Sequence, residues 1–165
     1  MRNVIQTISM QNRLYPVIFD ARCKAVFKDT SLFTILIIDD NTPFRYSLRK
    51  TLEGRFPLIT VQEAARGLDG LKKINNCLPH LIFMDIHLPD MNGLDLSRRI
   101  KTDHSDICIV IFTNDDLPEY RTAAIESGAD HIAPKDSWSG DKTFELVESV
   151  LTGLGLDRYG IKVGS

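Results

Sequence analysis

The residues of this chain that could do chemistry follow short apolar runs, at the points where buried strands would end. The polar residues placed in this way are Asp39, Asp40, Asp85, Thr113 and Lys135. The runs that precede the first four are residues 34–38, 81–84 and 107–112. In open α/β sheets, ligands bind at the carboxyl ends of the strands. We therefore expect these five side chains to meet at one edge of a sheet.

Asp39, Asp40 and Asp85 are carboxylates, which repel one another and raise one another's pKa when they are brought together. A cation among them relieves that repulsion. Oxygen donors suit Mg²⁺ with several retained waters, and the sequence has no His/Cys set of the kind that binds Zn²⁺. An Asp pair after a strand can equally form a turn and a helix cap, so Asp39 and Asp40 alone leave both interpretations open. Asp85, which follows a different strand, favours the metal site.

Lys135 and Thr113 would add a fixed cation and a hydroxyl donor to the carboxylates. Together with a metal ion, they form a set that can hold the three equatorial oxygens of a phosphoryl group. An aspartate can attack phosphorus in line and form an acyl phosphate. Taken singly, Lys135 resembles a solvated lysine and Thr113 a strand-end threonine. Their joint placement predicts phosphoryl chemistry at a carboxylate.

The elements that would position these residues alternate along the chain from Thr34 onward. β-Branched runs and segments of helical period follow one another in five rounds, which predicts an α/β fold with a doubly wound parallel sheet. The predicted strands are residues 34–38, 58–61, 80–84, 107–112 and 130–133. The predicted helices lie near residues 42–54, 68–74, 94–100, 116–128 and 144–151. We expect Thr42 to cap the first helix, Pro43 to occupy its first position, and Gly54 to end it.

The composition is that of an ordinary globular domain. The chain has 165 residues, 43% hydrophobic and 25% charged, with a net charge of -2, which predicts one domain and gives no electrostatic case for direct nucleic-acid binding. No apolar stretch approaches the ~18 residues of a membrane span, and Met1–Met10 lacks the core of a signal peptide. Cys23, Cys77 and Cys108 read as small buried hydrophobes rather than a metal or redox site. These features predict a cytoplasmic protein without membrane insertion.

Two segments fall outside the alternating pattern, and we assign no function to either. Residues 1–32 form an N-terminal extension that is rich in Lys and Arg. From Val17 to Phe27 the odd positions are apolar, which fits either one extra strand or a loosely ordered extension. Residues 152–165 form a short, glycine-rich C-terminal tail.

Residues 33–151 resemble the receiver domain of bacterial two-component response regulators. The resemblance rests on four motifs: Ile37-Ile38-Asp39-Asp40, the stretch Met84-Asp85-Ile86-His87-Leu88-Pro89-Asp90-Met91-Asn92-Gly93-Leu94, Ile111-Phe112-Thr113, and Gly128-Ala129-Asp130 ahead of Lys135. The long stretch after Asp85 is specific by itself, and the other motifs follow in order. The resemblance implies a flavodoxin-like (βα)5 fold.

The resemblance also implies that Asp85 accepts a phosphoryl group from a histidine kinase or a histidine phosphotransfer protein. Asp40 and Asp85 would bind Mg²⁺ through their carboxylates, and His87 through its backbone carbonyl. Asp39 would act mostly through water. Thr113 and Lys135 would contact the phosphoryl oxygens.

In the family, movement of the switch threonine is coupled to an inward turn of an aromatic residue on the fifth strand. This remodels the face of the fourth helix, fifth strand and fifth helix, where we expect a downstream protein partner. Here the aromatic position is Ile132, which cannot swing a ring, so any switch would rely on Thr113 and loop movement. Asn114 stands where a small residue is usual, and Lys135 is followed by Asp136 instead of a proline.

His87 and Asp115 lie two residues after Asp85 and Thr113, at positions that face the attacking water in the family. They are candidates for setting the lifetime of the phosphoryl group. His87 can equally be a solvated loop residue, because its expected metal contact uses backbone.

Three functional hypotheses follow. The first is a single-domain signalling switch in a phosphorelay, because no output module fits after Leu151. The second is the receiver part of a DNA-binding transcriptional regulator whose output domain has been removed. The third is an aspartyl-phosphate phosphatase of the haloacid-dehalogenase type, which is disfavoured because His87 replaces the second Asp of that motif.

Overall fold

The computed structural model describes residues 5–10, 13–18, 33–114, 118–136 and 139–157, and the chain divides into two units, 1–31 and 32–165. The first unit contains an antiparallel hairpin of strands β1 (Ile5–Met10) and β2 (Arg13–Ile18). The sequence did not predict this hairpin. The extra strand expected over residues 17–27 falls almost entirely outside the described residues.

The second unit is a five-stranded parallel sheet in the order β4-β3-β5-β6-β7. Its strands are β3 (Thr34–Ile38), β4 (Thr60–Ala64), β5 (Leu81–Asp85), β6 (Cys108–Thr113) and β7 (His131–Pro134). Its helices are α1 (Thr42–Arg55), α2 (Gly67–Asn76), α3 (Gly93–Asp103), α4 (Pro118–Glu126) and α5 (Gly140–Gly153). The strand order reverses at β3, which has β4 on one side and β5 on the other, so the predicted doubly wound fold is confirmed.

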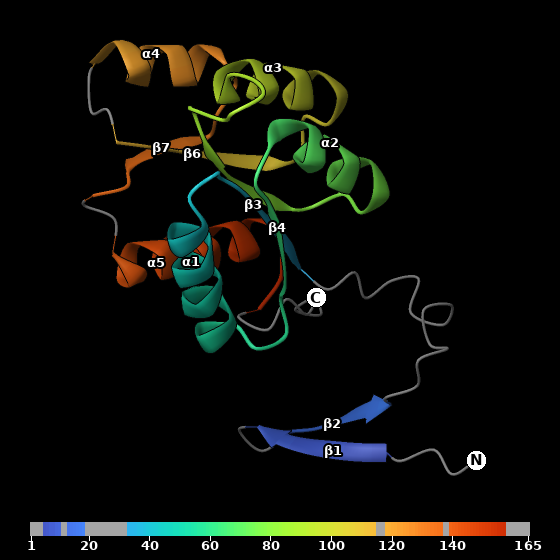
Figure 1. Ribbon diagram of the computed structural model, residues 1–165. Coiled ribbons are helices and arrows are strands. Elements are labelled where there is room, and N and C mark those ends of the chain that lie inside the picture. Colours follow the sequence, from blue (N-terminus) through green and yellow to red (C-terminus); the bar gives the residue numbers. More distant parts are fainter. Residues whose placement is uncertain (1–4, 11–12, 19–32, 115–117, 137–138, 158–165) are drawn as a thin grey trace. The chain divides into compact units, whose positions relative to one another are not determined.

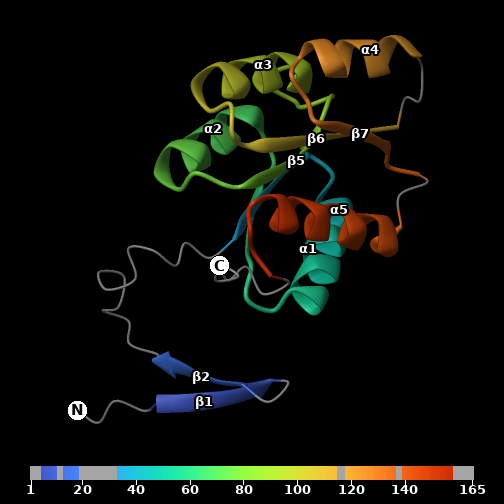
Figure 2. The ribbon, with the colours of Figure 1, turned by 180° about the vertical axis from the view of Figure 1, so that it is seen from behind.

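Helices cover both faces of this sheet. Figures 1 and 2 show α1 and α5 on one face and α2, α3 and α4 on the other. Alternate residues of each strand point to opposite faces. Ile35 and Ile37 therefore pack beneath α1 and α5, whereas Leu36 and Ile38 pack beneath the other three helices. Both faces are buried at the central strands β3, β5 and β6, which explains why these three strands are nearly continuous apolar runs.

Three strands start and end one residue later than the sequence predicted: β5, β6 and β7. The ladder continues because Asp85 pairs with Phe112, and Thr113 pairs with Pro134. Asp85 and Thr113 are thus the last residues of their strands, and their backbones are fixed by the sheet. Strand β4 lies two to three residues later than predicted, because its register places Thr60 beside Thr34.

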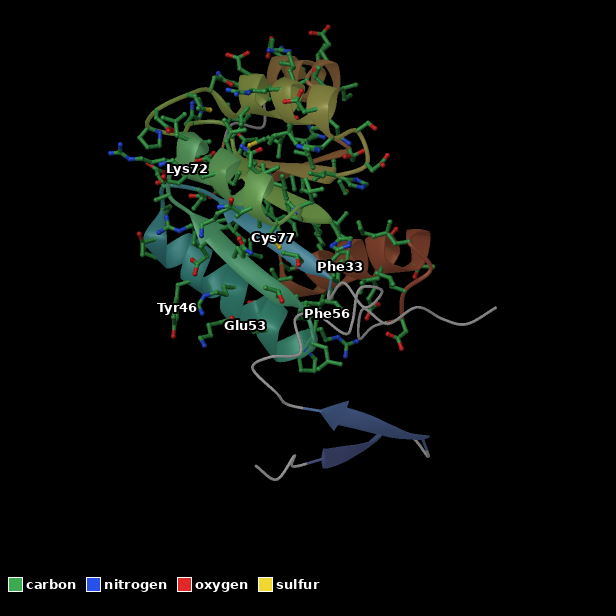
Figure 3. All side chains as sticks on the ribbon, turned by 90° about the vertical axis from the view of Figure 1, so that its right-hand side faces the viewer. Phe33, Tyr46, Glu53, Phe56, Lys72 and Cys77 are labelled. Atoms are coloured by element: carbon green, nitrogen blue, oxygen red, sulfur yellow. The ribbon has the colours of Figure 1, made fainter. Side chains whose placement is uncertain are left out.

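The predicted ends of the first helix were wrong. Asn41, not Thr42, is the N-cap, and its side chain accepts the N–H of Phe44 at 3.0 Å. The helix continues through Gly54 to Arg55, because the N–H of Phe56 still bonds back to Leu52 and Phe56 is buried in the core. Tyr46 projects outward from this helix and is 54% exposed (Figure 3).

The cysteine prediction was correct only in part. Cys77 is exposed at the end of α2 and Cys108 is half-buried at the start of β6. Both are free thiols, and burial raises the pKa of Cys108 to about 11. Cys23 lies outside the described residues.

Candidate functional site

The side chains of Asp39, Asp85 and Lys135 meet at the carboxyl edge of the sheet. Lys135 Nζ lies 2.7 Å from Asp39 Oδ2 and 2.9 Å from Asp85 Oδ2. Asp40 joins them, since one carboxylate oxygen from each of the three aspartates lies within 4.8 Å of the others. Parallel strands bring their carboxyl ends to one edge, so the predicted meeting of these residues is confirmed.

The two neighbouring aspartates have different environments. Asp39 is buried, its Oδ1 accepts the N–H of Asn41 at 2.8 Å, and its own N–H donates to Ala64. Asp40 is exposed, and among the described residues its side chain takes part in no hydrogen bond or ion pair. Asp39 is therefore fixed by its contacts, whereas the position of Asp40 depends on the backbone.

The pKa of Asp39 is raised, because burial disfavours the charged carboxylate and the contacts from Lys135 and the N–H of Asn41 offset that cost only in part. Burial also acts against the charge on Lys135. There the contacts with Asp39 and Asp85 outweigh it, and the pKa of Lys135 is raised. The lysine therefore stays protonated between the two carboxylates.

The aromatic ring of Phe44 lies against the ammonium group of Lys135. Lys135 Nζ lies 5.1 Å from the centre of the Phe44 ring, within the range of a cation–π contact. Phe44 packs edge-on against Phe112, which stacks on Phe83. The ammonium group is thus held between two carboxylates and a ring that belongs to the core.

Thr113 lies beside this group at the end of β6. Its side chain is buried, and its carbonyl oxygen accepts the N–H of Lys135 at 2.8 Å. This backbone bond ties the predicted phosphoryl-contacting residues to each other. Asn114, which follows Thr113, is exposed.

The loop after Asp85 is held by a close backbone approach. The N–H of Gly93 donates to Ile86 at 2.7 Å, and a Cβ at Gly93 would lie 2.0 Å from the carbonyl oxygen of Asp85. Asn92 then caps α3 by accepting the N–H of Leu94 at 2.8 Å. A glycine is required here because no side-chain atom fits against the backbone of Asp85.

The same loop also holds the neighbouring helix. Asp90 accepts the N–H groups of Gly67 and Leu68 at 2.8 and 2.9 Å, and these are the first residues of α2. The bond from Leu68 is the main reason that the pKa of Asp90 is lowered. A negative charge at a helix N-terminus also suits the helix dipole. No local pattern predicts this contact, because the two segments are distant along the chain.

His87 is exposed, as expected for a loop residue, but its ring has a partner that was not predicted. It meets the ring of Tyr120 on α4 at a centroid distance of 6.1 Å and an interplanar angle of 77°. The His87 backbone forms a bridge with Asn92 across the loop. His87 therefore links the loop of the expected phosphoacceptor to the helix that follows Thr113.

Two other predicted site residues remain, Ile132 and Asp115. Ile132 on β7 is partly buried and packs against the core beneath α2, α3 and α4. Its neighbour in β6 is Ile111. Asp115, the second candidate for setting the phosphoryl lifetime, lies outside the described residues.

Comparison with known proteins identifies the family. A profile described as the response regulator receiver domain matches residues 35–147. The chain belongs to this family. The sequence-based recognition is thereby confirmed, and this part of the chain is a signalling phosphoacceptor domain of the two-component type.

Curated relatives of the receiver domain extend well beyond the matched region. Response regulator MprA of Mycobacterium sp. (strain KMS) is 33% identical over 101 residues, which cover 61% of this chain and 43% of that protein. Protein-glutamate methylesterase/protein-glutamine glutaminase 3 of Hahella chejuensis is 34% identical over 125 residues, covering 74% of this chain and 36% of that protein. The chain thus spans less than half the length of these relatives.

Solved structures agree with the receiver fold. A CheY-like response regulator receiver domain protein from Methanospirillum hungatei JF-1 has a TM-score of 0.69 and 29% identity, covering 74% of this chain and 96% of that one. A LuxR-family two-component response regulator from Aurantimonas sp. SI85-9A1 has a TM-score of 0.67 and 27% identity, covering 74% and 87%. Among the residues described for this receiver chain, no helix has the length and apolar character that a membrane span requires.

The acidic residues of the receiver domain fit a hard divalent cation. Three carboxylates supply oxygen donors within reach of one another, and one of them, Asp40, faces solvent, where metal-bound waters could remain. Burial raises the pKa of Asp39 in spite of its contact with Lys135, so a further cation beside it would favour the charged carboxylate. A magnesium ion suits this set of oxygen donors and would add positive charge beside the buried carboxylate of Asp39.

Proposed function

We propose that Asp85 is the phosphoacceptor and that this chain is a phosphorylation-dependent switch in a two-component phosphorelay. The observation that carries the proposal is the position of Lys135 Nζ between Asp39 and Asp85, at 2.7 and 2.9 Å. A lysine held there lies beside the carboxylate that would react. Membership of the receiver family supports the same assignment.

In the proposed reaction, a carboxylate oxygen of Asp85 attacks the phosphorus of a phosphohistidine. A new P–O bond forms and the P–N bond breaks, and the electron pair of that bond returns to the imidazole nitrogen. Lys135 and the Thr113 hydroxyl contact the phosphoryl oxygens and stabilise the charge that develops on them. The Gly93 contact fixes the backbone of Asp85, so its carboxylate is preorganised.

The proposed cofactor is Mg²⁺, held by the carboxylates of Asp40 and Asp85 and by the backbone carbonyl of His87, with Asp39 acting mostly through water. When bound, it neutralises charge on the carboxylates and on the transferring phosphoryl group. Asp39 contributes by holding Lys135, because its Oδ2 lies 2.7 Å from the ammonium.

The proposed partners are a histidine kinase or a histidine phosphotransfer protein on the input side. On the output side we propose a protein that binds the face formed by α4, β7 and α5. Ile132 lies on β7, one of the three elements of that face, and has no ring to turn. The signal would therefore reach the face through Thr113 and the loop that leads to α4.

Phosphorylation with a small donor tests the central assignment. The wild-type chain is incubated with acetyl phosphate and Mg²⁺, and intact-mass spectrometry should find one base-labile phosphoryl group. Asp85→Asn should give none, whereas Asp95→Asn, which changes an exposed side chain on α3, should react like wild type. No adduct on wild type, or an undiminished one on Asp85→Asn, would overturn the proposal. Continuous phosphate release from many monoesters would instead indicate a phosphatase.

A second candidate is that the receiver domain regulates a DNA-binding output domain within a longer protein. It is supported by the 43% coverage of the MprA relative and by the LuxR-family regulator among the solved structures. Determining the full reading frame in the source genome tests it. A helix-turn-helix module in the same frame would favour this candidate over the single-domain switch.

A further inference from the structure

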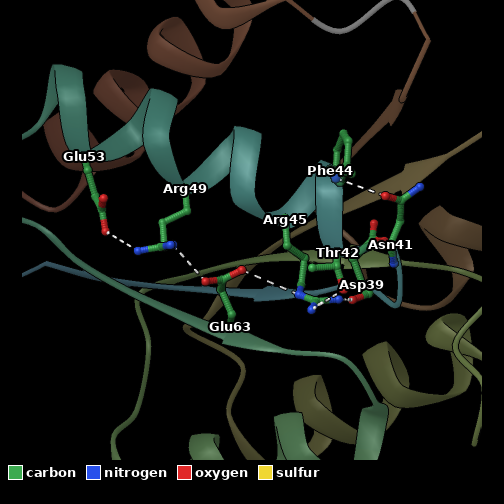
Figure 4. A network of polar contacts seen from close by, with 8 residues as sticks. All are labelled: Asp39, Asn41, Thr42, Phe44, Arg45, Arg49, Glu53 and Glu63. Carbon is green, nitrogen blue, oxygen red and sulfur yellow. Dashed lines mark hydrogen bonds and ion pairs between the residues drawn. The ribbon is translucent and has the colours of Figure 1, made fainter.

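Arg45 on α1 joins three parts of the site. One arm of its guanidinium donates to the backbone carbonyl of Asp39, and the other donates to Thr42 Oγ1 at 3.0 Å. Its Nε forms an ion pair with Glu63 Oε1 at 3.5 Å (Figure 4). The side chain is only 12% exposed, so these contacts fix it in one orientation.

Glu63 is in turn held from its other side. Its Oε2 lies 2.8 Å from Arg49 Nε, and Arg49 also contacts Glu53 at 3.3 Å, one turn further along α1. Figure 4 shows this row of alternating charges running from Glu53 to Asp39. Glu63 is on β4, opposite Ile37, so the row joins the helix to the sheet just before the acidic pair.

The carbonyl that Arg45 binds belongs to the peptide between Asp39 and Asp40. On the other side of Asp40, the Asn41 N–H donates to Asp39 Oδ1 at 2.8 Å, so Arg45 and this bond together hold the backbone before and after Asp40. Asp40 is exposed and, in the described part of the chain, has no side-chain contact to hold it. Its direction therefore depends on the peptide plane that Arg45 fixes.

We propose that Arg45 is a positioning residue for Mg²⁺ binding, which aims the carboxylate of Asp40 by holding the carbonyl of Asp39. The inference rests on the proposed metal site and adds a residue that does not touch the metal. A planar guanidinium can serve the carbonyl, Thr42 and Glu63 at once, whereas a lysine ammonium lacks that geometry. Residues that orient metal ligands commonly contribute about 10–100-fold in metal affinity.

The sign of the effect separates positioning from simple charge. Arg45 is a cation near a cation site, so if it acted through charge alone, its removal would strengthen Mg²⁺ binding. If it positions Asp40, both Arg45→Ala and Arg45→Lys weaken binding, although the second keeps the charge. Arg55→Ala, which removes an arginine paired with Glu148 at the far end of α1, is the matched control.

The test is an NMR titration of the backbone amides with MgCl₂ in the absence of phosphodonor. We expect the Kd of Arg45→Lys to rise about tenfold, that of Arg45→Ala to rise at least as much, and that of Arg55→Ala to match wild type. Unchanged or tighter binding by Arg45→Ala would overturn the inference. If neither Arg45 variant folds, Thr42→Val removes one acceptor of the guanidinium and should still raise the Kd. An unchanged Kd there would also overturn it.

The same titration separates the two proposals. Wild type that is phosphorylated on Asp85 and binds Mg²⁺, together with unaffected Arg45 variants, would refute the role of Arg45 alone. Wild type that does not bind Mg²⁺ would refute both the proposed cofactor site and the role of Arg45 in it.

Discussion

Lys135 Nζ lies 2.7 Å from Asp39 Oδ2, and the two groups form an ion pair that is 10% and 1% exposed. The pair joins the end of β3 to the residue after β7, two strands that are not adjacent in the sheet. Asp85, on the strand beside β3, contacts the same ammonium. One lysine thus contacts two carboxylates at the edge of the sheet.

Lys135→Met should destabilise the protein, because it leaves two buried carboxylates without their cation. We expect a loss of about 3 kcal/mol in the free energy of unfolding, measured by urea denaturation at pH 7 without Mg²⁺. Added Mg²⁺ should recover part of that loss by binding the folded state. Lys72→Met is the control, because Lys72 is 75% exposed and its removal should change stability by less than about 0.5 kcal/mol. Equal stability of the two variants would contradict the role of the buried pair.

Gly93→Ala should disturb the loop that follows the proposed phosphoacceptor, Asp85. The added Cβ would lie 2.0 Å from the carbonyl oxygen of Asp85, so the backbone has to move. We expect a marked fall in the rate of phosphorylation by acetyl phosphate and a loss of stability. Gly54→Ala is the matched control. Gly54 lies within α1, and a Cβ added there would meet nothing within 4 Å. Gly54→Ala should therefore raise stability by about 0.5–1 kcal/mol. Wild-type rates in Gly93→Ala would show that the loop adapts without cost.

Acid should weaken the amino end of the sheet through His80. Its Nδ1 accepts the N–H of Thr34 at 3.1 Å, its ring stacks on Phe33, and burial lowers its pKa below 6.5. The unfolded chain therefore binds a proton at higher pH than the folded one. This contribution to stability is complete above pH 6.5 and declines as the pH falls from there to the lowered pKa of the folded state.

The measurement for His80 is the free energy of unfolding by urea at a series of pH values. His80→Asn keeps an acceptor near the Thr34 N–H but cannot titrate, so the decline just below pH 6.5 should be smaller than in wild type. Parallel pH curves for the two proteins would exclude His80 as the source.

Tyr120 should influence the lifetime of the phosphoryl group through His87. Tyr120→Phe keeps the ring that His87 meets at 6.1 Å, so we expect the dephosphorylation rate of wild type. Tyr120→Ala removes the ring and should change the rate in the same direction as His87→Ala. If the two residues act as a unit, the double variant should show no further change. Identical rates for wild type and His87→Ala would eliminate a side-chain role for His87.

The ends of the elements were less predictable than their existence. Strands β5 and β6 each extend one residue past their apolar run, because the polar residue at the end of each strand still completes the ladder. Asn41, and not the predicted Thr42, caps α1, because both residue types can cap a helix and only the backbone conformation selects between them. The shift of β4 reflects register, which depends on the neighbouring strand.

The sequence alone determined the fold class and the acidic site at the edge of the sheet. This was possible because parallel strands bring all their carboxyl ends together, so a polar residue after each apolar run has a known destination. Only the tertiary structure decided how the site is divided: Asp39 buried on Lys135, Asp40 exposed, Arg45 on the carbonyl between them and Tyr120 against His87. These contacts join residues whose separation along the chain follows no local period. They arise from the packing of helices on the sheet, which no local pattern in the sequence encodes.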